Sequence, residues 1–85
     1  MRIENKDSQT RSWFAYNYED TSQSIALGSG SLKAGEQKDW DPPKNASGYY
    51  TVLIKRNAGG GSIMAGGSGL KNATFSFDGY RLTIT

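Results

Sequence analysis

Short runs of β-prone residues alternate along this chain with clusters of Gly, Asn, Asp, Ser and Pro. No segment repeats its apolar residues with the 3.6-residue period of an amphipathic helix. Short runs bounded by turn-forming clusters are typical of an antiparallel sandwich or barrel. We therefore predict a single all-β domain over residues 1–85: a small antiparallel β-sandwich, Greek-key-like, with seven to eight short strands and no significant helix.

The clearest strand candidate is Tyr49 to Lys55, which carries apolar side chains on both faces. A strand of this kind is expected at the centre of a sheet, covered on both sides. In the segment Arg11 to Tyr18, alternation would place Phe14, Tyr16 and Tyr18 on one face and Trp13 and Ala15 on the other.

The remaining strands are expected to be shorter. The dipeptide Asp78-Gly79 predicts a tight turn before a final strand, Tyr80 to Thr85, with Tyr80, Leu82 and Ile84 facing inward. We expect Gly28 to Lys38 to form a loop and residues 57–61 to form a hairpin connection. Further strands are expected at Ile3, Gln23–Leu27, Ser62–Ala65 and Thr74–Asp78.

The supply of aromatic rings exceeds what a thin core can use. Apolar residues make up 35% of the chain, and ten of its 85 residues are Trp, Tyr or Phe. A domain of this size is marginal on burial alone, so self-association into a homo-oligomer would be one way to bury more surface. Because a sandwich has one inner face per sheet, we expect some rings to be exposed.

The chain has few of the residue types that support catalysis or metal binding. The chain has no His, the commonest general base, and no Cys nucleophile, so we expect no enzyme and no cofactor. Only oxygen ligands are present, so calcium is the one metal to consider. The carboxylate pairs Glu19/Asp20 and Asp39/Asp41 lack calcium-loop spacing, and turn capping explains them as well.

Charge and hydropathy restrict the partners. The net charge is +2 and the longest basic run is the pair Lys55-Arg56, so there is no strong nucleic-acid signal. The N-terminal residues lack the apolar segment of a signal peptide, and no stretch approaches the ~18 apolar residues of a transmembrane helix. We expect the chain as given to be soluble.

The best functional signal is the segment Asp39-Trp40-Asp41, which is followed by two prolines. Aromatic rings beside carboxylates and basic groups can stack on sugars while the polar groups fix the hydroxyls. Two alternatives stay open: Trp13 and Trp40 could both plug the core, or the rings could contact a membrane surface. The candidate ligand-binding residues are Trp40, Asp39, Asp41, Tyr16, Tyr18 and Arg56.

The first half of the chain has Ile3 and Asn5 before a polar turn, then a strand bearing Trp13, and then an L-x-x-G-E turn at Leu32 to Glu36. In this order of features it resembles the opening of small β-sandwich lectins and cytolysins of the actinoporin, fungal fruit-body lectin and aegerolysin types. YNYEDTSQSIALGSG also resembles a βγ-crystallin hairpin, although the calcium signature is missing. These resemblances imply a β-sandwich that recognises glycans or lipid headgroups.

We therefore expect a non-catalytic binding module with lectin-like recognition of a carbohydrate or lipid headgroup. The alternative is a structural or interaction protein, an inhibitor or self-assembling subunit, that binds another protein through sheet edges. Single-stranded nucleic acid is a weaker option, because rings and basic residues could form a stacking platform but the positive charge is dispersed.

Overall fold

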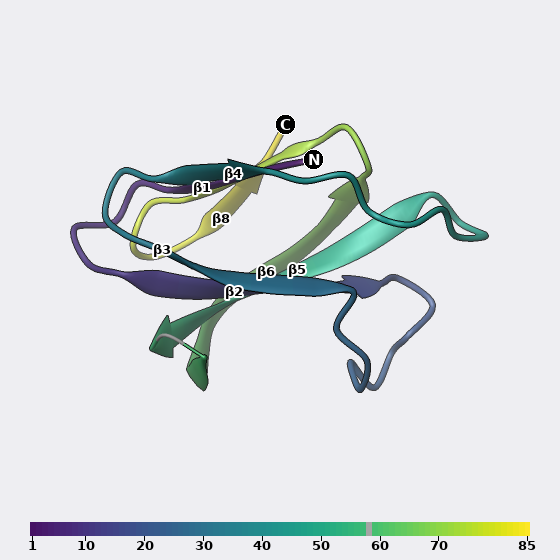
Figure 1. Cartoon of the computed structure of the whole chain (residues 1–85), viewed down its shortest axis with the longest axis horizontal. Helices are drawn as coiled ribbons and strands as arrows, with labels where there is room; N and C mark the ends of the chain where they lie inside the picture. The colour runs from purple at the N-terminus through teal and green to yellow at the C-terminus, as the bar shows by residue number, and fades with distance from the viewer. Residues whose placement is uncertain (58) are drawn as a thin grey trace.

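The computed structural model describes residues 1–57 and 59–85, and these form an all-β sandwich of two four-stranded sheets (Figure 1). Sheet A has the order β4-β1-β7-β8 and sheet B the order β3-β2-β5-β6. The all-β sandwich prediction is confirmed, with eight strands and no helix in the described residues. The strands are β1 (Arg2–Asn5), β2 (Arg11–Asn17), β3 (Gly28–Leu32), β4 (Gln37–Asp39), β5 (Tyr49–Asn57), β6 (Gly60–Leu70), β7 (Thr74–Phe77) and β8 (Leu82–Ile84).

One strand pairing departs from the expected antiparallel pattern. β1 and β7 run parallel, with Ile3 opposite Phe75, whereas every other pairing among the described residues is antiparallel. Parallel neighbours need a long crossover connection. Here the chain between them passes through sheet B as β2 and β3, returns to sheet A as β4, and passes through sheet B again as β5 and β6. Strands β1 and β7 therefore meet although they are far apart in sequence.

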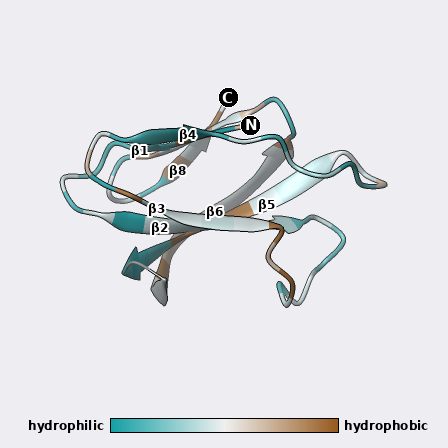
Figure 2. Ribbon diagram, viewed as in Figure 1, coloured by the Kyte–Doolittle hydropathy of each residue, from teal (hydrophilic) through white to brown (hydrophobic). Residues whose placement is uncertain are grey.

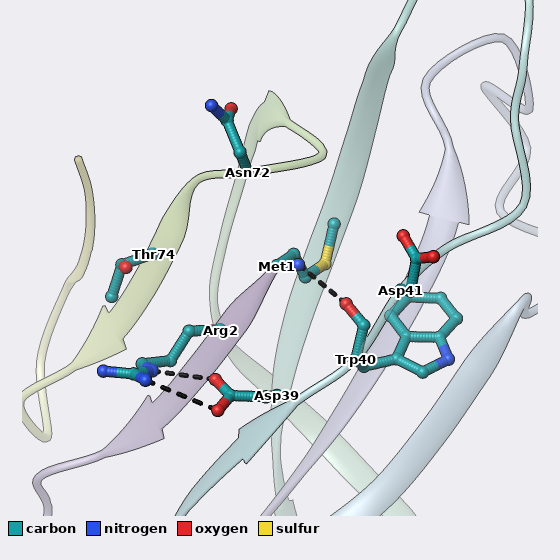
Figure 3. Close-up of a pocket in the computed structure, with 7 residues that line it drawn as sticks. All are labelled: Met1, Arg2, Asp39, Trp40, Asp41, Asn72 and Thr74. Carbon is teal, nitrogen blue, oxygen red and sulfur yellow. Dashed lines mark hydrogen bonds and ion pairs between the residues drawn. The ribbon is translucent and has the colours of Figure 1, made fainter.

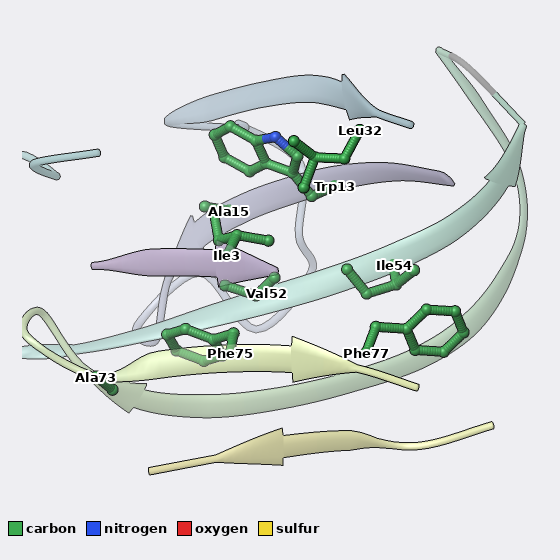
Figure 4. Close-up of a cluster of buried hydrophobic side chains, with 9 residues drawn as sticks. All are labelled: Ile3, Trp13, Ala15, Leu32, Val52, Ile54, Ala73, Phe75 and Phe77. Atoms are coloured by element: carbon green, nitrogen blue, oxygen red, sulfur yellow. The ribbon is translucent and has the colours of Figure 1, made fainter. Parts of the chain in front are cut away.

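The core lies between the sheets and draws on both (Figure 4). Large side chains dominate it, as the low apolar content requires, and three of them, Ile3, Phe75 and Phe77, are fully buried on sheet A. In the same sheet, the edge strand β4 is hydrophilic along its length, as colouring by hydropathy shows (Figure 2). The buried cluster comprises Ile3, Trp13, Ala15, Leu32, Val52, Ile54, Ala73, Phe75 and Phe77.

The strand predicted at Tyr49 to Lys55 is confirmed as a central strand, because β5 lies between β2 and β6. Its inner face is buried, as at Val52 and Ile54. The outer face is covered only in part: Leu53 is buried, whereas Tyr49 is 45% exposed.

The expected loop over Gly28 to Lys38 is wrong, because this segment contains β3 and β4. Glycine normally weakens a strand, but it also marks places where another group approaches the backbone closely. A β-carbon on Gly28 would lie 2.6 Å from Cζ2 of Trp40, and one on Gly30 would lie 2.9 Å from Nε1 of Trp13. The two glycines of β3 therefore leave room for the two indoles.

The strand expected at Gln23–Leu27 is also wrong, since the strand begins only at Gly28. The preceding residues form a loop in which the Asp20 carboxylate accepts hydrogen bonds from the backbone N–H of Ser24 and Ile25, each 3.0 Å long. Ile25 is 72% exposed as a result.

The last two hairpins differ from expectation in detail. The short strand expected at Ser62–Ala65 is part of the eleven-residue β6. The Asp78-Gly79 turn is confirmed, but Tyr80 faces solvent rather than the core, because it belongs to the turn and its N–H is held by the Asp78 carboxylate at 2.8 Å. The expected hairpin connection at 57–61 includes residue 58, which lies outside the described residues.

Candidate binding site

Three of the six predicted site residues lie together at one end of the sandwich. Asp39, Trp40 and Asp41 line a pocket of about 520 Å³ where β4 ends. The register of sheet A completes it, because Arg2 in β1 lies opposite both Asp39 in β4 and Thr74 in β7. The pocket is lined by Met1, Arg2, Asp39, Trp40, Asp41, Asn72 and Thr74 (Figure 3).

An ion pair forms one wall of the pocket. Arg2 Nε donates to Asp39 Oδ1 at 2.8 Å, and Nη2 donates to Oδ2 at 3.4 Å. This hydrogen-bonded contact lowers the pKa of Asp39 below its ordinary value and raises that of Arg2. Both groups are therefore charged at neutral pH, and the exposed pair orders the wall more than it stabilises the fold.

Trp40 is half-buried and fixed in place. Its backbone N–H donates to Met1 O at 2.9 Å, and its carbonyl accepts from the Met1 amine at 2.7 Å. Its indole packs over Gly28 and against Trp13, with ring centroids 5.5 Å apart and planes tilted by 50°. Trp13 is only 3% exposed. Trp13 is thus a core residue, whereas Trp40 both packs on the core and lines the pocket.

The pocket presents polar groups with unused hydrogen-bonding capacity. Among residues 1–57 and 59–85, the side chains of Asp41, Asn72 and Thr74 form no hydrogen bond with one another or with any other group. The Asp41 carboxylate offers acceptors only, whereas the Asn72 amide and Thr74 hydroxyl offer both donors and acceptors. Pockets that bind small ligands usually combine a few such polar groups with a partly apolar wall.

The other three predicted residues do not join this pocket. Tyr16 lies on sheet B and is only 5% exposed, so little of its ring can meet a ligand. Tyr18 is 54% exposed and packs on Tyr49, with ring centroids 6.0 Å apart. Arg56 is exposed near the opposite end of β5, seven residues from Tyr49, or about 23 Å at the usual rise per residue.

The expected surplus of exposed rings is present in the structure. Tyr18, Tyr49 and Tyr80 are 54%, 45% and 90% exposed, whereas Tyr16 and Tyr50 are buried. Tyr18 follows directly after β2 and Tyr49 begins β5, so this pair lies at the same end of the sandwich as Trp40.

No group of three or more metal-ligating side chains is gathered anywhere in the described part of the chain. Of the four carboxylates considered for calcium, Asp41 has no partner within the described residues, whereas Glu19 accepts the Ser47 N–H. Asp20 caps its own loop through Ser22, Ser24 and Ile25, and Asp39 pairs with Arg2.

Sequence reasoning missed the pocket residues Arg2, Asn72 and Thr74. They reach Trp40 only through the pairing of β1 with β4 and β7, and no local pattern marks them. Asp39, Trp40 and Asp41 could be predicted because they are adjacent in the sequence and together form an unusual segment.

Comparison of this chain with protein-family models, curated proteins and solved structures gave no match. The residues that the structure describes include no helix with the length and apolar character needed to cross a membrane.

Proposed function

We propose that this protein is a lectin-like binding module that takes a sugar unit in the pocket around Trp40. The observation that carries the proposal is that three polar side chains without hydrogen bonds, Asp41, Asn72 and Thr74, line one pocket of about 520 Å³ together with a half-buried tryptophan. A sugar combines apolar C–H faces with a ring of hydroxyls, and such a pocket can satisfy both.

The wall is organised before any ligand arrives. The Arg2–Asp39 pair and the double backbone contact between Met1 and Trp40 fix four of its positions. Preorganised groups lose little conformational entropy on binding, which raises affinity for a small ligand. The resemblance of the N-terminal half to small β-sandwich lectins supports the same function.

The test is an oligosaccharide array, followed by titration of the best ligand with tryptophan fluorescence as the readout. Asp41→Asn should weaken binding about 10-fold, and Asn72→Ala about 3-fold, as expected for loss of a charged and a neutral hydrogen bond. Neither side chain contributes to the core, so folding should be unaffected. Thr83→Ala, on β8, is the matched control and should bind like the wild type.

Absence of binding to every oligosaccharide on the array would contradict the proposal. So would a ligand whose affinity is unchanged in both Asp41→Asn and Asn72→Ala. Trp40→Phe is a second probe, because it keeps a ring against Trp13 and leaves Trp13 as the only tryptophan. A ligand-induced fluorescence change that persists undiminished in this variant would place the ligand elsewhere.

A second candidate function is protein binding through sheet B. The β6 strand lies at the edge of this sheet, spans eleven residues and contains neither a charged residue nor a proline. Natural edge strands usually carry such residues as protection against pairing. Leu70, 47% exposed, lies opposite Tyr49 and extends an apolar surface beside this edge. Light scattering over a wide concentration range, with Ser68→Lys as the blocking variant, tests this function.

A further inference from the structure

A second pocket adjoins the one around Trp40. It has a volume of about 430 Å³ and shares Asn72 with the first pocket. The segment Lys44–Gly48 forms one side, Leu70 and Lys71 form the other, and Tyr50 contributes at the base. A ligand that fills the first pocket and extends past Asn72 would enter this space.

The two pockets differ in charge. In the first, the charges balance: Arg2 and the Met1 amine are positive, and Asp39 and Asp41 are negative. The second contains two cations, Lys44 and Lys71, and no carboxylate. Neither lysine forms an ion pair with any residue in the described ranges 1–57 and 59–85.

An acidic residue of the neighbouring loop, Glu19, forms no ion pair with Lys44 or Lys71. Glu19 Oε1 accepts the backbone N–H of Ser47 at 3.2 Å, and Glu19 does not line the pocket. The two ammonium groups are therefore available to an anion, and their attraction for it adds at a shared site.

The loop that carries Lys44 is held rigidly. The Tyr50 hydroxyl donates to Pro43 O at 2.5 Å. The Asn45 side chain donates to Tyr49 O at 2.8 Å and accepts the Gly48 N–H at 2.8 Å. These contacts fix the backbone on both sides of Lys44, so a bound anion would have to order only the lysine side chains.

We propose that this second pocket is a subsite for the acidic group, a carboxylate or a sulfate, of the ligand that binds beside Trp40. The inference rests on the proposed carbohydrate-binding function and narrows it: the ligand is an acidic oligosaccharide. A flat anionic membrane fits less well, because it would contact the whole end of the sandwich, including the carboxylates of Asp41 and Glu19, whereas a single acidic group would meet only the two lysines.

The experiment uses the full chain and an array printed in matched sets, with each neutral oligosaccharide core beside its sialylated and its sulfated derivative. The wild type should bind an acidic derivative at least 10-fold more tightly than its neutral core, and added salt should reduce that difference. The double variant Lys44→Gln/Lys71→Gln should bind both forms equally, at the level of the neutral core. Which derivative gains more distinguishes a carboxylate ligand from a sulfate.

The matched control is Lys33→Gln/Arg81→Gln, which removes the same charge from exposed turns at the opposite end of the sandwich. It should keep the preference for acidic sugars. Equal binding of acidic and neutral forms by the wild type, or a preference that survives in Lys44→Gln/Lys71→Gln, would overturn this inference and leave the neutral-sugar site intact.

Two further outcomes bear on the ligand class. Failure of the wild type to bind any oligosaccharide would overturn the proposed function together with this inference. Binding to phosphatidylserine vesicles, without any gain from an acidic group on a sugar, would overturn the acidic-oligosaccharide assignment.

Discussion

The indole of Trp40 packs directly over the α-carbon of Gly28, so closely that a β-carbon there would lie 2.6 Å from Cζ2 and 2.9 Å from Cε2. The contact joins the residue after β4, in sheet A, to the first residue of β3, in sheet B. It fixes the inner side of the ring that lines the candidate sugar pocket. A residue without a side chain in sheet B thus sets the position of a side chain of the candidate site, attached to sheet A.

Substitution Gly28→Ala tests this contact. The added methyl group must displace the indole, so we expect a loss of about 1 to 3 kcal/mol in the free energy of unfolding, as for other overpacked sites. Sugar binding should weaken in parallel, because the pocket wall moves. Urea unfolding and ligand titration measure the two effects. Ser29→Ala, exposed on the same strand, is the control, and a Gly28→Ala protein with wild-type stability and binding would contradict the packing.

Asn5 is a second residue on which the fold depends. It is 2% exposed, and its side-chain amide donates to Gln9 O at 2.8 Å and Leu32 O at 2.9 Å, while its oxygen accepts the Asp7 N–H at 3.0 Å. Asn5→Ala leaves buried backbone groups without partners, which should cost about 2 to 4 kcal/mol. Urea unfolding measures the loss. Gln9→Ala keeps the backbone acceptor, so it should be nearly neutral; equal effects would contradict this role.

Asp7 and Arg11 make the stability depend on pH. Arg11 Nε donates to Asp7 Oδ2 at 2.7 Å, and this hydrogen bond lowers the pKa of Asp7 below its ordinary value of 3.8. The pair therefore contributes fully to stability above pH 3.8, and its contribution is lost as the pH falls through the folded-state pKa. Asp7→Asn should cost about 2 to 3 kcal/mol at neutral pH, as expected for a charged, largely buried hydrogen bond.

The effect of the Asp7–Arg11 pair is measured as the difference in unfolding free energy between the wild type and Asp7→Asn. Asp20, Asp39 and Asp78 also have lowered pKa values, so the wild type loses stability in acid for several reasons. The gap in unfolding free energy between the wild type and Asp7→Asn should close below pH 3.8, because the protonated carboxyl then resembles the amide. Glu4→Gln, which removes only a long 3.7 Å pair with the exposed Lys6, should show little gap at any pH. A gap for Asp7→Asn that persists in acid would refute the ion-pair assignment.

Tyr50→Phe probes the loop that carries Lys44. It removes the hydroxyl that donates to Pro43 O but keeps the buried ring. We expect a cost of about 1 kcal/mol in unfolding free energy. The preference for acidic sugars should also fall, because the loop is less firmly held. Tyr49→Phe, whose ring is partly exposed, is the matched control and should change neither quantity.

The sequence predicted the parts of the fold that depend on local pattern. The run at Tyr49 to Lys55 identified the central strand because its apolar residues are contiguous, and Asp78-Gly79 identified a turn by its chemistry alone. Strand β3 was missed because Gly28 and Gly30 have low strand propensity, and the reason for them, the two indoles, comes from elsewhere in the fold.

The candidate site was predictable only where it is contiguous. Asp39, Trp40 and Asp41 form one segment, and their composition marked them. Arg2, Asn72 and Thr74 join them because β1 pairs with β4 on one side and runs parallel to β7 on the other. Long-range pairing of this kind leaves no local signature. Tyr16 was a candidate by residue type, but strand alternation does not reveal that it is covered.

Sugar binding beside Trp40 is tested most directly by a nuclear magnetic resonance titration of the backbone amides with the tightest-binding oligosaccharide from the array. We expect the largest changes in amide chemical shift at Arg2, residues 39–41 and residues 72–74, with smaller changes at Lys44 and Lys71. Changes centred instead on Tyr18, Tyr49 and the edge strand β6, with the amides around Trp40 unmoved, would contradict this prediction.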